Sequence, residues 1–146
     1  MSSILKDEVV TGKENKAPTL VIHGHPGTGK STFAAEFGKT LIASKDGGLS
    51  EINVSKVALE GQGTEKLVQL MKELATENHK FDTFCIDGFE HCEQEVVKEV
   101  CLANNVETLG DVPYGKAYAQ VRSKVQDLLA MLKELRDLKN MNIILT

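Results

Sequence analysis

Along this chain, short runs of apolar residues alternate with segments in which apolar residues recur every three or four positions. The short runs predict β-strands at residues 19–23, 40–43, 54–59, 82–86 and 142–146. The wider spacing predicts α-helices at residues 31–39, 64–78, 89–103 and 114–138, with a loop at 104–113. Because strands alternate with helices, we expect an α/β fold with a mostly parallel sheet and right-handed crossovers.

The longest predicted helix carries an apolar stripe along one side. Its members step by four and three residues: Tyr114, Tyr118, Val121, Val125, Leu128, Leu132 and Leu135. Such a stripe packs a helix onto a sheet, and it is also the pattern of a coiled-coil seam. The helix after the first strand is indicated by Phe33, Ala34 and Phe37.

The composition is that of one ordered domain. Hydrophobic residues make up 41% of the 146 positions and charged residues 26%, which excludes wholesale disorder. No apolar run approaches about 18 residues, so we expect no membrane-spanning helix. The three cysteines, Cys85, Cys92 and Cys101, contain no C-x-x-C pair. We therefore expect no disulfide framework and no zinc site, and a location in the reducing cytoplasm.

The net charge of −4 is unevenly distributed. Residues 46–107 contain five lysines and thirteen acidic residues, whereas the segments before and after them each carry a small positive excess. The chain as a whole therefore lacks the basic footprint of a nucleic-acid-binding protein. A local basic face within residues 108–146 is compatible with this charge distribution.

A glycine-rich segment between the first predicted strand and helix matches the P-loop pattern G-x-x-x-x-G-K-[ST] at every defined position. It reads Gly24-His25-Pro26-Gly27-Thr28-Gly29-Lys30-Ser31 and is followed by Thr32. Glycines allow backbone N–H groups to wrap around phosphates, and the N-terminus of the next helix favours negative charge. We expect these nine residues to bind ATP, with Lys30 reaching the β- and γ-phosphates and Ser31 binding Mg²⁺.

Acidic residues near the P-loop are the candidates for metal binding and catalysis. Asp87 ends the apolar run that begins at Phe81, which predicts the second Mg²⁺ contact. Hydrolysis also needs a group that orients or deprotonates water. Glu90 and Asp46 are both candidates, although Glu90 also suits a first helical turn and Asp46 also suits an Asp-Gly turn.

Other P-loop classes are marked by motifs that this sequence lacks. It contains neither the N-K-x-D tetrapeptide of GTPases nor an LSGGQ-like transporter signature. Its two arginines, Arg122 and Arg136, both lie on the long predicted helix, which argues against the arginine-rich lid of a nucleotide kinase. A nucleotide-dependent binding module with little turnover and a small-molecule kinase remain alternatives to an ATPase.

From residue 17 onward, the chain resembles the AAA-domain, RecA-like ATP-binding proteins common in bacteriophages. The resemblance rests on the P-loop, the Asp46-Gly47-Gly48-Leu49 segment, the strand at 81–87, the Tyr114–Tyr118 segment and the closing residues 142–146. It implies a three-layer P-loop NTPase fold at 17–146, preceded by a flexible segment at 1–16. It also implies Mg²⁺-dependent ATP binding and hydrolysis in support of phage DNA recombination or replication.

The resemblance extends to individual residues and includes departures. Asp46 stands where family members often carry a glutamate, and on that ground it is favoured weakly over Glu90 as the catalytic residue. Thr146 is expected near the γ-phosphate sensor position. In the family the closing strand usually continues into further sheet, so we expect a domain that is incomplete at its C-terminal end.

The expected partners follow from the resemblance and from the long predicted helix. Single-stranded DNA, a DNA-recombination protein and a second copy of the chain are the candidates. The helix carries the cations Lys116, Arg122, Lys124, Lys133, Arg136 and Lys139. They could face phosphates or a neighbouring subunit, where Arg122 would act as an arginine finger. The alternative is a solvated helix face.

Overall fold

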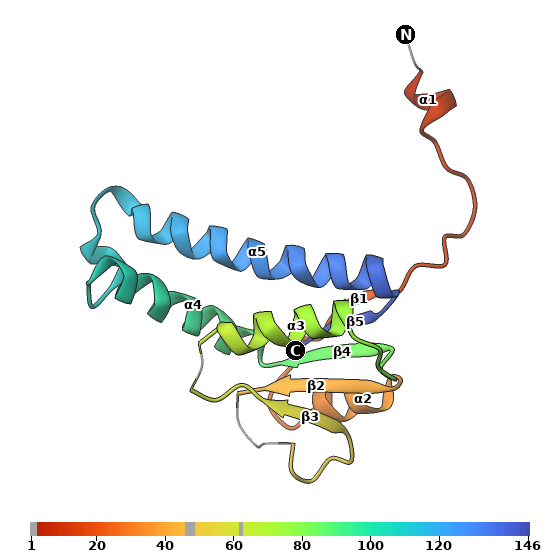
Figure 1. The fold of residues 1–146 in the computed structure, drawn as a ribbon, viewed down its shortest axis with the longest axis horizontal. Helices are drawn as coiled ribbons and strands as arrows, with labels where there is room; N and C mark the ends of the chain where they lie inside the picture. Colours follow the sequence, from red (N-terminus) through yellow and green to blue (C-terminus); the bar gives the residue numbers. More distant parts are fainter. Residues whose placement is uncertain (1–2, 46–48, 62) are drawn as a thin grey trace.

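The computed structural model describes residues 3–45, 49–61 and 63–146 (Figure 1). Its five strands form one sheet in the order β1-β5-β4-β2-β3, and every neighbouring pair is parallel. The strands are β1 (Thr19–Val21), β2 (Thr40–Ser44), β3 (Ser55–Ala58), β4 (Thr83–Asp87) and β5 (Asn142–Leu145). All five predicted strands are therefore present, with bounds that differ by up to two residues at either end.

Helices cover both faces of the sheet, which gives the three layers expected of a P-loop NTPase fold (Figure 1). On one face lie α3 (Glu65–Thr76), α4 (Phe89–Asn104) and α5 (Lys116–Lys139). The other face is covered by α2 (Lys30–Glu36) and by the segment around Leu49. Alternate residues of the central strands point to opposite layers, as the pleat of a strand requires. Phe84 and Ile86 pack under α3, α4 and α5, whereas Cys85 packs under α2.

The predicted stripe on the long helix is confirmed from Val121 onward, since Val121 and Val125 pack, partly buried, against the core. Leu128, Leu132 and Leu135 are buried against the sheet and its neighbouring helices. The prediction is wrong at its start, because α5 begins at Lys116 and Tyr114 lies outside it, 97% exposed. Tyr118 is also more than half exposed. Here α4 and α5 extend together beyond the edge of the sheet, so no sheet is available to cover this end (Figure 1).

The structure differs from the sequence prediction in two smaller respects, around α2 and in the predicted loop at 104–113. In α2, Ala34 is buried and Phe33 is exposed, because a seven-residue helix directs only a narrow face toward the sheet. Phe37, directly after the last residue of α2, is exposed as well. The predicted loop at 104–113 contains a 3-10 turn at Leu109–Asp111, and another follows at Pro113–Gly115. Short 3-10 turns lack the long apolar period by which helices are recognised in a sequence.

The segment before β1 leaves the body of the domain (Figure 1). Its four-residue helix α1 (Ile4–Asp7) buries no side chain. It joins the domain at Ala17, whose N–H donates to Asn140 Oδ1 at 3.0 Å. Within the described residues, none of the helices is both long and apolar enough to cross a membrane.

Candidate functional site

The carboxyl ends of the parallel strands bring the predicted site residues to one edge of the sheet. Val21 of β1 pairs with Leu145 of β5, and Ile86 of β4 pairs with the same Leu145. The P-loop after β1, Asp87 at the end of β4 and Thr146 after β5 therefore emerge side by side. In open α/β sheets, ligands bind at this edge.

The P-loop runs from Gly24 to the first turn of α2. Gly27 and Gly29 have φ values of +82° and +93°, which side chains with a Cβ rarely adopt. A Cβ at Gly24 would lie 3.1 Å from Thr28 Oγ1, and that hydroxyl donates to the carbonyl of His25 at 2.8 Å. The loop is thus a tight turn whose glycines are required by its shape.

Lys30 begins α2 and points back into the loop. Its Nζ donates to the carbonyl oxygen of Gly24 and, at 3.3 Å, to that of His25. A cation held over a glycine-rich loop is the arrangement that binds phosphate oxygens. The hollow beside it is lined by Pro26, Gly27, Gly29, Lys30, Ser31 and Thr32.

Asp87 joins three elements through its two carboxylate oxygens. Oδ2 accepts a hydrogen bond from Ser31 Oγ at 2.7 Å, and Oδ1 accepts one from Thr146 Oγ1 at 2.6 Å. The Thr146 hydroxyl in turn accepts from the backbone N–H of Gly88 at 3.0 Å. The network holds the P-loop helix, the end of β4 and the end of β5 in one arrangement.

This oxygen set suits a magnesium ion that is shared with a nucleotide. Mg²⁺ prefers hard oxygen ligands, and in such sites one or two protein groups suffice because phosphates and water supply the rest. Ser31 and Asp87 provide one hydroxyl and one carboxylate at hydrogen-bond distance from each other. Among the described residues, no group of three or more His, Cys, Asp or Glu side chains is arranged to bind a metal ion by itself.

The two candidate catalytic acids differ in what the structure shows. Glu90 is exposed and lines the same cleft as His23, Lys30, Asp87 and Thr146. Asp46 lies outside the described residues. Of the two histidines near the P-loop, His23 faces this cleft, whereas the His25 carbonyl oxygen accepts from Thr28 within the loop.

The cysteines lie away from this chemistry. Cys85 and Cys92 are buried, and burial raises the pKa of Cys85 to about 12 and that of Cys92 to about 11. Cys101 is buried in α4. Thiols held in the protonated form are poor nucleophiles, so Cys85 and Cys92 act as small apolar residues of the core.

Comparison with protein families gives a match over residues 16–146, to a family described as AAA domain. The chain belongs to this AAA domain family. The match covers the P-loop, all five strands and the Asp87 network. No curated protein and no solved structure matches the chain.

Membership in the AAA domain family supports ATP binding at the P-loop edge. It also accounts for the all-parallel sheet between two layers of helices. Two features of this AAA domain were not predicted from the sequence: the Thr146 hydroxyl as a partner of Asp87, and a hollow on the other side of Asp87. Thr146 was expected near the γ-phosphate sensor position from the family resemblance, but no local pattern indicated its contact with Asp87.

Proposed function

We propose that this AAA domain binds ATP together with Mg²⁺ and hydrolyses it. The observation that carries the proposal is the hydrogen bond between Ser31 and Asp87 at the mouth of the P-loop. It brings a hydroxyl and a carboxylate together beside a lysine, and this trio is what a Mg²⁺–triphosphate complex requires. Mg²⁺, when bound by Ser31 and Asp87, would neutralise charge that develops on the phosphates.

The residues of the P-loop have separate roles in this proposal. The N–H groups of residues 24–32 hold the phosphate oxygens, because the glycines leave the backbone uncovered. Lys30 exchanges its carbonyl partners for β- and γ-phosphate oxygens. Thr146 holds the Asp87 carboxylate in its orientation by donating to its Oδ1.

Glu90 is our candidate for the residue that activates water. Its carboxylate lines the cleft that contains Lys30, Asp87 and Thr146, and it lies at the start of α4. Asp46 remains the second candidate, on the family resemblance. A general base must come within hydrogen-bond reach of the attacking water, directly or through one further water.

The experiment measures phosphate release from ATP with Mg²⁺ and without any added acceptor. We expect turnover by the wild-type protein and a loss of roughly 10²- to 10⁴-fold in Glu90→Gln, with ATP affinity retained. The same loss in Asp46→Asn, with Glu90→Gln unaffected, would transfer the role to Asp46. No phosphate release at all would favour a binding module, and transfer only to an added acceptor would favour a kinase.

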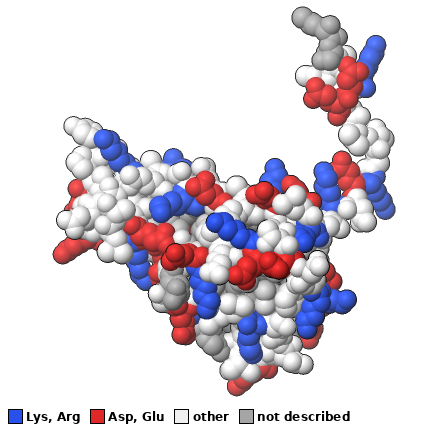
Figure 2. Space-filling view, viewed as in Figure 1, with Lys and Arg blue, Asp and Glu red and all other residues white. Residues whose placement is uncertain are grey.

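We further propose that the activity supports phage DNA recombination or replication in the host cytoplasm. The cations of α5 support this proposal. Figure 2 shows lysines and arginines lying among acidic side chains on the face in view, and several cations of α5 already have partners within the domain. Lys124 pairs with Glu99, Arg136 pairs with Asp137, and Lys139 donates to the Glu77 carbonyl. Lys116, Arg122 and Lys133 have no such partner in the described residues.

These three cations are the candidates for contact with single-stranded DNA or with a neighbouring copy. Arg122 and Lys133 are eleven residues apart on α5, which places them on one side of the helix. Contacts to a phosphate backbone release counterions, so binding should weaken steeply as salt rises. Hydrolysis measured with and without single-stranded DNA over a salt series tests this role. Equal rates throughout would remove DNA as the partner.

A further inference from the structure

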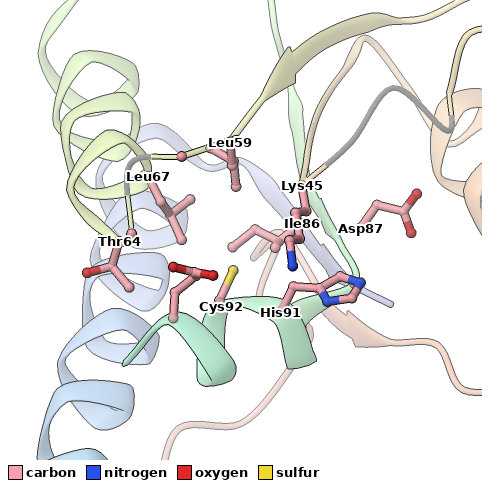
Figure 3. A pocket seen from close by; sticks show the side chains of 12 residues that line it. Lys45, Leu59, Thr64, Leu67, Ile86, Asp87, His91 and Cys92 are labelled. Atoms are coloured by element: carbon pink, nitrogen blue, oxygen red, sulfur yellow. The ribbon is translucent and has the colours of Figure 1, made fainter. Parts of the chain in front are cut away.

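A second hollow lies on the far side of Asp87, between the strand ends and helices α3 and α4 (Figure 3). Its walls are mainly apolar and come from Leu59, Leu67, Ile86 and Cys92. The hollow is narrow, with a volume of about 30 Å³, and it is partly open to solvent. The hollow therefore admits only a slender ligand or the narrow end of a larger one.

Two nitrogen-bearing side chains give this apolar hollow a polar end. Lys45 follows β2, and His91 lies in the first turn of α4. In Figure 3 the Lys45 ammonium points into the hollow, toward the His91 ring. The Lys45 side chain has no hydrogen bond or ion pair with any described residue. His91 Nδ1 lies 3.4 Å from Gln94 Oε1, which leaves Nε2 unpaired within the described part of the chain.

The charged groups around the hollow indicate whether a ligand should be positive or negative, and how many charges it should carry. The ammonium of Lys45, which has no partner among the described residues, favours an anion. Helices α3 and α4 both begin at the hollow with their partially positive ends. The carboxylates of Asp87 and Glu95 also line it. Glu95 is already paired with Lys98 at 2.6 Å, but two nearby carboxylates still repel a multiply charged anion. One negative charge on an apolar stem meets all these conditions.

We propose that this hollow binds a short aliphatic carboxylate, separately from the nucleotide. The carboxylate accepts a hydrogen bond from Lys45 Nζ beside the His91 ring, and the aliphatic stem lies against Leu67 and Cys92. A small number of convergent polar groups over an apolar floor is typical of small-molecule sites. Asp87 and Gly88 line both this hollow and the nucleotide cleft, so the two ligands would be neighbours.

The experiment titrates the ¹⁵N-labelled protein with butyrate and follows its amide resonances. A ligand of about six heavy atoms is expected to bind in the millimolar range. We expect shifts concentrated at Ile86, His91 and Cys92, and an affinity at least about tenfold weaker in Lys45→Gln. Lys72→Gln is the matched control, because Lys72 is an exposed lysine of α3 that does not line the hollow.

Two further ligands and one further variant complete the test. Butyramide has the same shape without the charge and should bind at least about tenfold more weakly than butyrate. Inorganic phosphate should shift residues 24–32 instead. Lys30→Ala should still bind butyrate, so loss of the nucleotide site and loss of this site are distinguishable. The proposal is overturned if butyrate leaves the three amides unshifted, if butyramide binds equally well, or if Lys45→Gln binds butyrate with wild-type affinity.

Discussion

The hydroxyl of Ser31 donates to Oδ2 of Asp87 at 2.7 Å, although the two residues are 56 positions apart in the chain. The contact exists because β1 and β4 are separated only by β5 and all three run in the same direction. Their carboxyl ends therefore deliver the P-loop helix and the acidic residue to the same place. In this AAA domain, parallel topology rather than sequence proximity creates the proposed Mg²⁺ site.

Replacing Lys30 tests the nucleotide site most directly. Lys30→Ala removes the cation over the loop and should weaken ATP binding at least about tenfold, because a charge-assisted hydrogen bond contributes roughly 1.5–3 kcal/mol. Calorimetric titration with ATP gives the affinity. Lys39→Ala is the control, since Lys39 is an exposed lysine before β2, at the opposite edge of the sheet. Equal ATP affinity in wild type and Lys30→Ala would contradict the P-loop assignment.

Replacing Asp87 tests the contribution of Mg²⁺ to ATP binding separately from that of the P-loop. Ser31 and Thr146 donate to different oxygens of Asp87, and Asp87→Asn replaces one of these oxygens with an NH₂ group that cannot accept. The variant also cannot offer a carboxylate to Mg²⁺. We expect ATP affinity to fall more in the presence of Mg²⁺ than with EDTA. The measurement is the ratio of dissociation constants with and without Mg²⁺ in both proteins. The same ratio in both would show that Asp87 contributes no metal contact.

The sequence predicted the part of the site that lies within short segments. The P-loop, the end of β4 and the order of helices and strands follow from local spacing, and the structure has them. The contact between Thr146 and Asp87 depends on β5 lying next to β4, which no local pattern specifies. The hollow that contains Lys45 and His91 likewise needs β2, α3 and α4 to meet.

Apolar residues that are exposed in the structure show why burial was harder to predict than helix formation. Phe33 and Tyr118 lie in helices, as their spacing indicates, and yet both are exposed. Periodicity reports only that one side of a helix is apolar. Whether another element covers that side depends on helix length and on where the sheet ends.

Glu99 connects three helices and should make stability depend on pH. Its Oε1 accepts from the Thr64 N–H and hydroxyl at the start of α3, and its Oε2 lies 3.5 Å from Lys124 Nζ on α5. Partial burial raises the pKa of Glu99, but the hydrogen bonds from Thr64 and the charge of Lys124 outweigh it, so the pKa is lowered. A lowered pKa stabilises the fold above the unfolded value, and this contribution is lost as pH falls through the folded value.

Glu99→Gln should therefore destabilise the protein at pH 7 by about 1 kcal/mol, a small effect because the pair is partly solvated. The difference between the two proteins should shrink as the pH falls below the ordinary value of 4.5 and on through the lower pKa of the folded state. Urea unfolding at several pH values measures it. A difference that stays constant with pH would mean that the charge of Glu99 contributes nothing.

Tyr114 has a backbone conformation that its side chain disfavours. Its φ is 60° and its ψ 23°, in the left-handed region, and its side chain is 97% exposed. A residue with a Cβ pays roughly 1–2 kcal/mol in this region, whereas glycine loses about 0.5–1 kcal/mol through the greater freedom of the unfolded chain. Tyr114→Gly should therefore raise the free energy of unfolding by roughly 0.5–1 kcal/mol. Tyr118→Gly, in the regular part of α5, should lower it by about 1 kcal/mol. Urea unfolding of both variants checks the opposite signs, and a loss of stability in Tyr114→Gly would show that the exposed ring makes a stabilising contact.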